Sequence, residues 1–88
     1  MRRVHVVVSG RVQAVGYRYN ALVRADRLGL AGWIRNRSDG AVEAEVEGPP
    51  ETVDELLDWM AEGPPSAHVR DVRVTDIPPE GRPGFEVR

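Results

Sequence analysis

The sequence of 88 residues contains no cysteine, no lysine and only one phenylalanine. The absence of cysteine excludes disulfides, thiolate–metal sites and cysteine nucleophiles. Without lysine, the chain has no Schiff-base residue and no Walker-type phosphate loop. No apolar run approaches the length of a membrane span, and the N-terminus lacks the apolar segment of a signal peptide. We therefore expect a cytoplasmic protein with no membrane partner.

The composition is that of an ordinary globular protein, with 41% hydrophobic and 30% charged residues. It predicts a single domain over residues 1–88. The formal net charge of −2 argues against a nucleic-acid partner, which needs a basic surface. His5 and His68 lie far apart in the sequence and lack ligand spacing, so we expect no metal and no cofactor.

In the first half of the chain, an alternating pattern of apolar and polar residues is followed by a helical pattern. Val4, Val6 and Val8 share one face of a predicted strand over 3–9. Apolar residues then recur at helical spacing over 17–28, and Gly29 supplies a left-handed helix end. The sequence therefore predicts a strand, a connecting loop and a helix.

A hairpin is predicted from segments 31–37 and 41–47, which flank Ser38-Asp39-Gly40. A three-residue loop with glycine last pairs Arg35 with Glu43 and places Asn36 on the apolar face. A two-residue Asp-Gly loop would shift the register by one and reverse the faces. The charge pairing favours the longer loop. The three strand glutamates Glu43, Glu45 and Glu47 are interpreted as a solvated face.

The second half contains a helix that begins near Pro50, followed by strands at 69–75 and 85–88. Thr52 and Glu55 suggest a capping box in that helix, and Val72 and Val74 are expected to point inward. The predicted order of strand, helix, strand, strand, helix, strand with a short fifth strand is typical of a ferredoxin-like α+β sandwich. In that fold two helices cover one face of an antiparallel sheet.

The stretch between the first strand and the first helix, Gly10 to Arg18, is the candidate site. Helix-start N–H groups lack intrahelical partners and favour anions, and a guanidinium binds two phosphate oxygens at once. The alternative interpretation is a simple strand-to-helix turn with a surface arginine. If the first two strands are adjacent, Asn36 lies at the same rim as Arg18.

Two motifs resemble the acylphosphatase family: Gly10-Arg11-Val12-Gln13-Ala14-Val15-Gly16-Tyr17-Arg18 and Leu28-Gly29-Leu30-Ala31-Gly32-Trp33-Ile34-Arg35-Asn36. The resemblance extends through Asp39-Gly40, Glu47-Gly48 and Gly63-Pro64 to the closing phenylalanine strand. It implies metal-free hydrolysis of acyl phosphates to a carboxylate and inorganic phosphate. The alternative function is a non-catalytic ferredoxin-like module that binds an anion or a protein.

The resemblance also implies the site residues. Arg18 binds the phosphate together with backbone N–H groups of the loop, and Asn36 positions the attacking water. The loop residues are Gln13, Ala14, Val15, Gly16, Tyr17 and Arg18. We expect a phosphate or sulfate ion to bind there, and the protein to be a monomer.

Two loop residues depart from the family pattern, which has glycine at Ala14 and commonly phenylalanine at Tyr17. If position 14 requires a positive φ, Ala14 costs about 1 kcal/mol or more and can misdirect one N–H donor. If φ is negative, Ala14 is harmless and stiffens the loop. The change at Tyr17 is expected to be mild.

Overall fold

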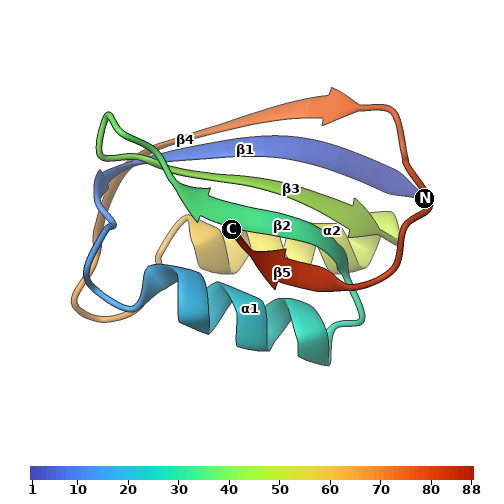
Figure 1. Cartoon of the computed structure of the whole chain (residues 1–88), viewed down its shortest axis with the longest axis horizontal. Coiled ribbons are helices and arrows are strands. Elements are labelled where there is room, and N and C mark those ends of the chain that lie inside the picture. Colours follow the sequence, from blue (N-terminus) through green and yellow to red (C-terminus); the bar gives the residue numbers. More distant parts are fainter.

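The computed structural model describes all residues from 1 to 88, and its element order confirms the predicted fold class. Two helices pack against one face of a single five-stranded sheet (Figure 1). The elements are β1 (Arg2–Arg11), α1 (Tyr17–Arg27), β2 (Ala31–Asn36), β3 (Val42–Gly48), α2 (Pro50–Met60), β4 (His68–Ile77) and β5 (Phe85–Val87). Neither helix is long and apolar enough to cross a membrane.

The strand order in the sheet is β4-β1-β3-β2-β5. The three pairs β4–β1, β1–β3 and β3–β2 are antiparallel, but β5 pairs with β2 in parallel. The sheet is therefore mixed: the antiparallel pairing expected from the sequence holds for β1 to β4, and the short β5 departs from it by pairing in parallel. The route of the chain explains the parallel pair. After β4 the chain crosses to the end of the sheet where β2 begins, so β5 starts there and runs beside β2 in the same direction (Figure 1).

The β2–β3 hairpin has the predicted three-residue loop. Arg35 lies opposite Glu43, and the Arg35 Nη2 atom is 2.6 Å from Glu43 Oε1. The turn is closed by a hydrogen bond from Arg37 N to Ala41 O at 2.8 Å, and Gly40 has φ 93°. Because the side chains of paired residues share a face, this register places Asn36 on the side of the sheet that the helices cover.

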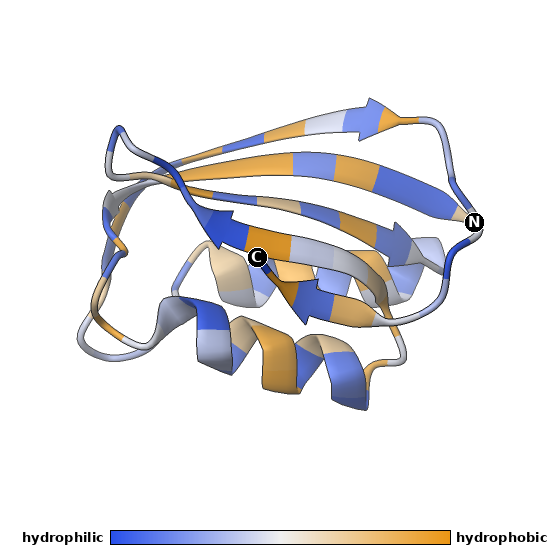
Figure 2. Cartoon of the chain, in the orientation of Figure 1, coloured by the Kyte–Doolittle hydropathy of each residue, from blue (hydrophilic) through white to orange (hydrophobic).

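The core lies between the sheet and the helices (Figure 2). Its largest contributions are the alternate valines of β1 and β3 and the apolar faces of the helices. The fully buried helix residues are Tyr17, Ala21, Ala25, Val53, Leu56 and Met60. The capping box at Thr52 is absent, because α2 begins at Pro50 and its N-cap Pro49 has no side-chain hydrogen bond.

Val74 points inward as expected but is not buried. Val74 pairs with Val6 and so faces the helix side, but its side chain is 41% exposed. The helices pack over β1, β2, β3 and β5, whereas β4 is an edge strand beyond most of this cover. Val72 on the same strand is half-buried.

The face of the sheet away from the helices is less solvated than predicted. Arg3 and Glu47 are only 3% and 5% exposed, and Arg3 Nη1 lies 3.1 Å from Glu47 Oε1. The Arg3 guanidinium also contacts Glu45 at 2.8 Å. The glutamates of β3 are therefore partners in an ion-pair network, because β1 places an arginine directly across from Glu47.

Candidate active site

The loop between β1 and α1 presents a row of free backbone N–H groups. No N–H from Gln13 to Arg18 donates a hydrogen bond to a backbone carbonyl. Gly16 is the N-cap of α1 and has φ 80°, a conformation that glycine adopts without steric cost, and it provides no side-chain cap. Because the dipole of α1 is positive at this end, the loop is suited to an anion.

Ala14 answers the question that the sequence left open. Its φ is 61°, and it is the only residue other than glycine with a positive φ. An L-residue in this region costs about 1–2 kcal/mol relative to the right-handed conformation. The loop therefore holds Ala14 under strain. This is the first of the two alternatives, in which position 14 requires a positive φ.

Arg18 is the second residue of α1 and is half-buried beside this loop. It takes part in no ion pair, whereas Arg3 and Arg35 on the sheet are each bound to a glutamate. A guanidinium that no carboxylate neutralises is available to an incoming anion. The loop N–H groups thus supply directed donors, and Arg18 adds an unpaired positive charge at the second residue of α1.

Asn36 is the last residue of β2 and pairs with Val42 of β3. Its Oδ1 atom is buried and has no hydrogen-bond partner in the protein. A buried acceptor without a partner costs about 1–3 kcal/mol. Asn36 is therefore not explained by stability, and its carboxamide has capacity for a ligand.

The two halves of the predicted site share one end of the sheet. The sequence allows β1 and β2 to be neighbours, but in the structure they are not adjacent. β3 lies between them, so that Val42 pairs with Val8 on one side and with Asn36 on the other. Because β1 and β2 are each antiparallel to β3, they run in the same direction and finish at the same end of the sheet. Figure 1 shows the β1–α1 loop and the β2–β3 turn at this end.

The Gln13 side chain joins these two halves. Its Nε2 atom donates to Arg37 O at 2.8 Å and to Ala41 O at 2.9 Å. Sequence reasoning assigned Gln13 only a backbone role. A polar side chain in a loop carries no signal for such a bridge, because its acceptors are carbonyl groups more than twenty residues away.

Two further hydrogen bonds attach the loop region to the rest of the fold. The Tyr17 hydroxyl donates to Met60 O at 2.7 Å, and burial of the ring raises the pKa of Tyr17. The Ser66 hydroxyl donates to Val15 O at 3.2 Å. The loop is therefore held from the α2 side as well as from the hairpin.

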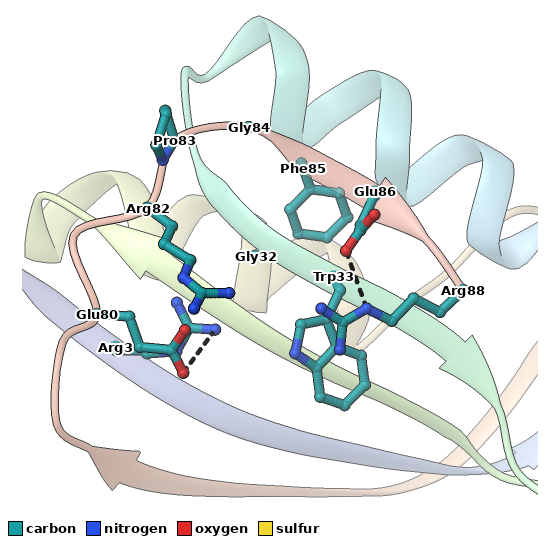
Figure 3. A pocket seen from close by; sticks show the side chains of 10 residues that line it. All are labelled: Arg3, Gly32, Trp33, Glu80, Arg82, Pro83, Gly84, Phe85, Glu86 and Arg88. Atoms are coloured by element: carbon teal, nitrogen blue, oxygen red, sulfur yellow. Dashed lines mark hydrogen bonds and ion pairs between the residues drawn. The ribbon is translucent and has the colours of Figure 1, made fainter.

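A separate cavity of about 280 Å³ lies on the face of the sheet away from the helices (Figure 3). Trp33, Arg82 and Arg88 line it together with Arg3, whose charge is already matched by Glu45 and Glu47. It contains none of the predicted site residues. Across the whole chain, no group of three histidine, aspartate or glutamate side chains is placed to hold a metal ion.

Comparisons with known proteins agree with this geometry. The acylphosphatase family model matches residues 4–87. Acylphosphatase of Trichormus variabilis is 54% identical over 86 residues, which cover 98% of this chain and 85% of the relative. Acylphosphatase of Thermococcus kodakarensis is 48% identical over 85 residues, covering 97% and 93% respectively. The crystal structure of acylphosphatase from Bacillus subtilis superimposes with a TM-score of 0.96 at 38% identity, covering 100% of this chain and 99% of that one. The chain therefore belongs to the acylphosphatase family.

Proposed function

We propose that this chain hydrolyses the carboxyl–phosphate bond of acyl phosphates, with Arg18 and the loop binding the phosphate and Asn36 orienting water. The proposal rests on one observation. A row of free N–H groups, followed by an arginine in no ion pair, lies at the same end of the sheet as a buried amide oxygen without a hydrogen-bond partner. Family membership over residues 4–87 supports the reaction class.

The phosphate half supplies charge and positioning. Its anionic oxygens accept hydrogen bonds from N–H groups of Gln13 to Arg18 and from the Arg18 guanidinium. Phosphoryl transfer depends mainly on positioning and on stabilising charge on the equatorial oxygens. Fixed backbone donors do both without reorganisation during the reaction.

The water half supplies the nucleophile. The Asn36 carboxamide binds water opposite the leaving carboxylate, and the water oxygen forms a bond to phosphorus as the bond to the acyl oxygen breaks. An acyl phosphate is a mixed anhydride whose carboxylate leaves without protonation, so no general acid is needed. Asparagine is a poor base, and we propose that a phosphate oxygen accepts the proton of the water.

We further propose that the chain acts as a cytoplasmic monomer that forms one domain over residues 1–88. All the residues assigned to the site come from one chain, and a single core cluster of 15 residues underlies them. Analytical ultracentrifugation of the active enzyme tests the monomer, and activity that appears only in a dimer fraction contradicts it.

The proposal is tested by phosphate release from a small acyl phosphate in the presence of a chelator. Arg18→Gln and Asn36→Ala are each expected to lower kcat/KM by about 10²–10³-fold, the usual effect of removing a stabilising donor. Inhibition by inorganic phosphate is expected to weaken in Arg18→Gln and to persist in Asn36→Ala.

Arg27→Gln is the matched control, because Arg27 is exposed at the other end of α1. Its activity should equal that of the wild type. Asn36→Ala should unfold at the same temperature or higher, since it removes an unsatisfied acceptor. If Arg18→Gln and Asn36→Ala fold and keep the full rate, the assigned mechanism is wrong. Phosphate binding without any turnover in the wild type favours a non-catalytic module.

A further inference from the structure

The Gln13 side chain occupies the space between the phosphate loop and the hairpin that carries Asn36. We propose that it is a positioning residue, which sets the separation between the bound phosphate and the water held by Asn36. This inference rests on the proposed function and adds to the backbone N–H of Gln13 a second role, for a side chain that contacts neither substrate nor water. Its basis is the pair of hydrogen bonds from Nε2 and their location.

Both acceptors flank Asn36. Arg37 follows it in the chain, and Ala41 precedes Val42, the residue paired with Asn36 across the hairpin. Ala41 O also accepts the hydrogen bond from Arg37 N that closes the turn. One amide nitrogen therefore holds both sides of the turn next to Asn36.

No other hydrogen bond connects the phosphate loop to the hairpin that carries Asn36. Pairing between β1 and β3 extends only to Val8 and Val42, and after a register shift at Ser9 and Gly10 the strand continues beside β4 alone. Between the loop residues 12–16 and the hairpin residues 36–42, the two bonds from Gln13 are the only hydrogen bonds. The sheet ladder thus ends before the site, and Gln13 continues the connection.

The chemical identity of the side chain matters. A primary amide offers two N–H groups on one nitrogen, which matches two carbonyl acceptors. Glutamate would direct a carboxylate at the same carbonyl oxygens and repel them. Methionine fills a similar length and offers no donor. Because an error of about 1 Å in reacting geometry can lower a rate by about 10²-fold, loss of this bridge is expected to affect the chemical step.

The experiment compares Gln13→Met with the wild type in steady-state hydrolysis of a small acyl phosphate. We expect kcat to fall about 10–100-fold, while the inhibition constant for inorganic phosphate changes less than about twofold. Arg18 and the loop N–H groups remain in place, so phosphate binding should persist. A purely structural role would instead lower the unfolding temperature and leave kcat below that temperature unchanged.

Ser66→Ala is the matched control. It removes a different side-chain hydrogen bond to the loop, from the Ser66 hydroxyl to Val15 O, without touching the connection to Asn36. Its kcat should stay within about twofold of the wild type. If Ser66→Ala loses as much kcat as Gln13→Met, general loosening of the loop explains both and the inference fails.

If Gln13→Met does not fold, Gln13→Asn keeps the amide but shortens its reach, and a reduced kcat with unchanged phosphate inhibition is expected.

A double-mutant cycle separates this inference from the proposed function. In an Asn36→Ala background, Gln13→Met should cost less than about twofold further in kcat, because the residue acts through Asn36. Equal losses in both backgrounds overturn the inference. Full activity of Gln13→Met alongside inactive Arg18→Gln and Asn36→Ala also overturns it but leaves the proposed function intact. Full activity of Arg18→Gln and Asn36→Ala refutes the proposed function itself.

Discussion

At the level of single residues, the candidate site contains two features that lower stability. Ala14 holds a left-handed backbone conformation, and Asn36 buries an acceptor that no protein group satisfies. Residues that break local rules at some energetic cost are concentrated at functional sites. The two residues lie in different halves of the proposed site, so the strain is local to the region where substrate would bind.

Replacing Ala14 by glycine is expected to stabilise the protein. Glycine removes the left-handed strain of about 1–2 kcal/mol, which exceeds the backbone entropy cost of about 0.4–1 kcal/mol in the unfolded chain. The free energy of unfolding should rise by up to about 1.5 kcal/mol, measured by urea denaturation.

The control is Ala61→Gly, because Ala61 is an exposed residue with φ −69° at the end of α2. There the entropy cost acts alone and the protein should become less stable. A loss of stability in both variants would show that the conformation of Ala14 is not strained.

At the level of the elements, the two helices are joined at the edge of the site. The Tyr17 hydroxyl, at the start of α1, donates to Met60 O at the end of α2. The Tyr17 ring also packs against Trp59, with centroids 5.2 Å apart. The ring is buried, and the hydroxyl is taken up by its hydrogen bond to α2. The departure from the phenylalanine common in the family thus adds a contact between helices.

Tyr17→Phe is expected to lower the free energy of unfolding by about 1 kcal/mol, since Met60 O loses its donor. The kcat should not change, because the hydroxyl lies outside the proposed chemistry. Thermal unfolding and steady-state kinetics measure the two effects. Tyr19→Phe serves as the comparison, because Tyr19 is 69% exposed and should show no change in stability. A large loss of kcat in Tyr17→Phe would assign the hydroxyl to the site.

At the level of the whole molecule, Glu47 connects parts of the chain that are distant in sequence. Its carboxylate accepts hydrogen bonds from Glu80 N at 2.7 Å and Gly81 N at 3.0 Å and pairs with Arg3. Glu80 and Gly81 belong to the segment that carries the chain from β4 to β5, at opposite edges of the sheet. One carboxylate therefore fixes this crossing to the central strand β3.

Acid should weaken this connection. The N–H group of Glu80, with those of Gly81 and Arg3, holds the pKa of Glu47 below its usual value. A carboxyl group whose folded-state pKa is lowered contributes stability above its unfolded pKa, and this contribution is lost as the pH falls through the folded-state pKa. The loss is therefore expected below about pH 4.3, the usual value for glutamate.

Glu47→Gln is expected to cost about 1.5–3 kcal/mol at pH 7, the range for hydrogen bonds to a charged group. The difference from the wild type should shrink toward pH 3, as Glu47 becomes protonated. Denaturant unfolding at several pH values measures this trend. Glu62→Gln, an exposed residue outside the ion pairs, should follow the wild type throughout. A constant difference between Glu47→Gln and the wild type across pH would contradict the assignment.

Local patterns were sufficient to predict several features of the fold. The alternation of Val4, Val6 and Val8 identified the buried face of β1, because strand side chains repeat every two residues. Ser38-Asp39-Gly40 set the hairpin register, because turn length fixes which residues pair. The loop motif and Asn36 identified the family. Their catalytic roles remain predictions.

The tertiary structure alone decided what depends on contacts between distant segments. The parallel pairing of β5, the placement of β3 between β1 and β2 and the burial of Glu47 follow from the packing of the whole sheet. The positive φ of Ala14 became visible only in the structure. The bridge from Gln13 joins carbonyl groups 24 and 28 residues away. A sequence pattern encodes local periodicity and turn chemistry, whereas these features require the free energy of the complete fold.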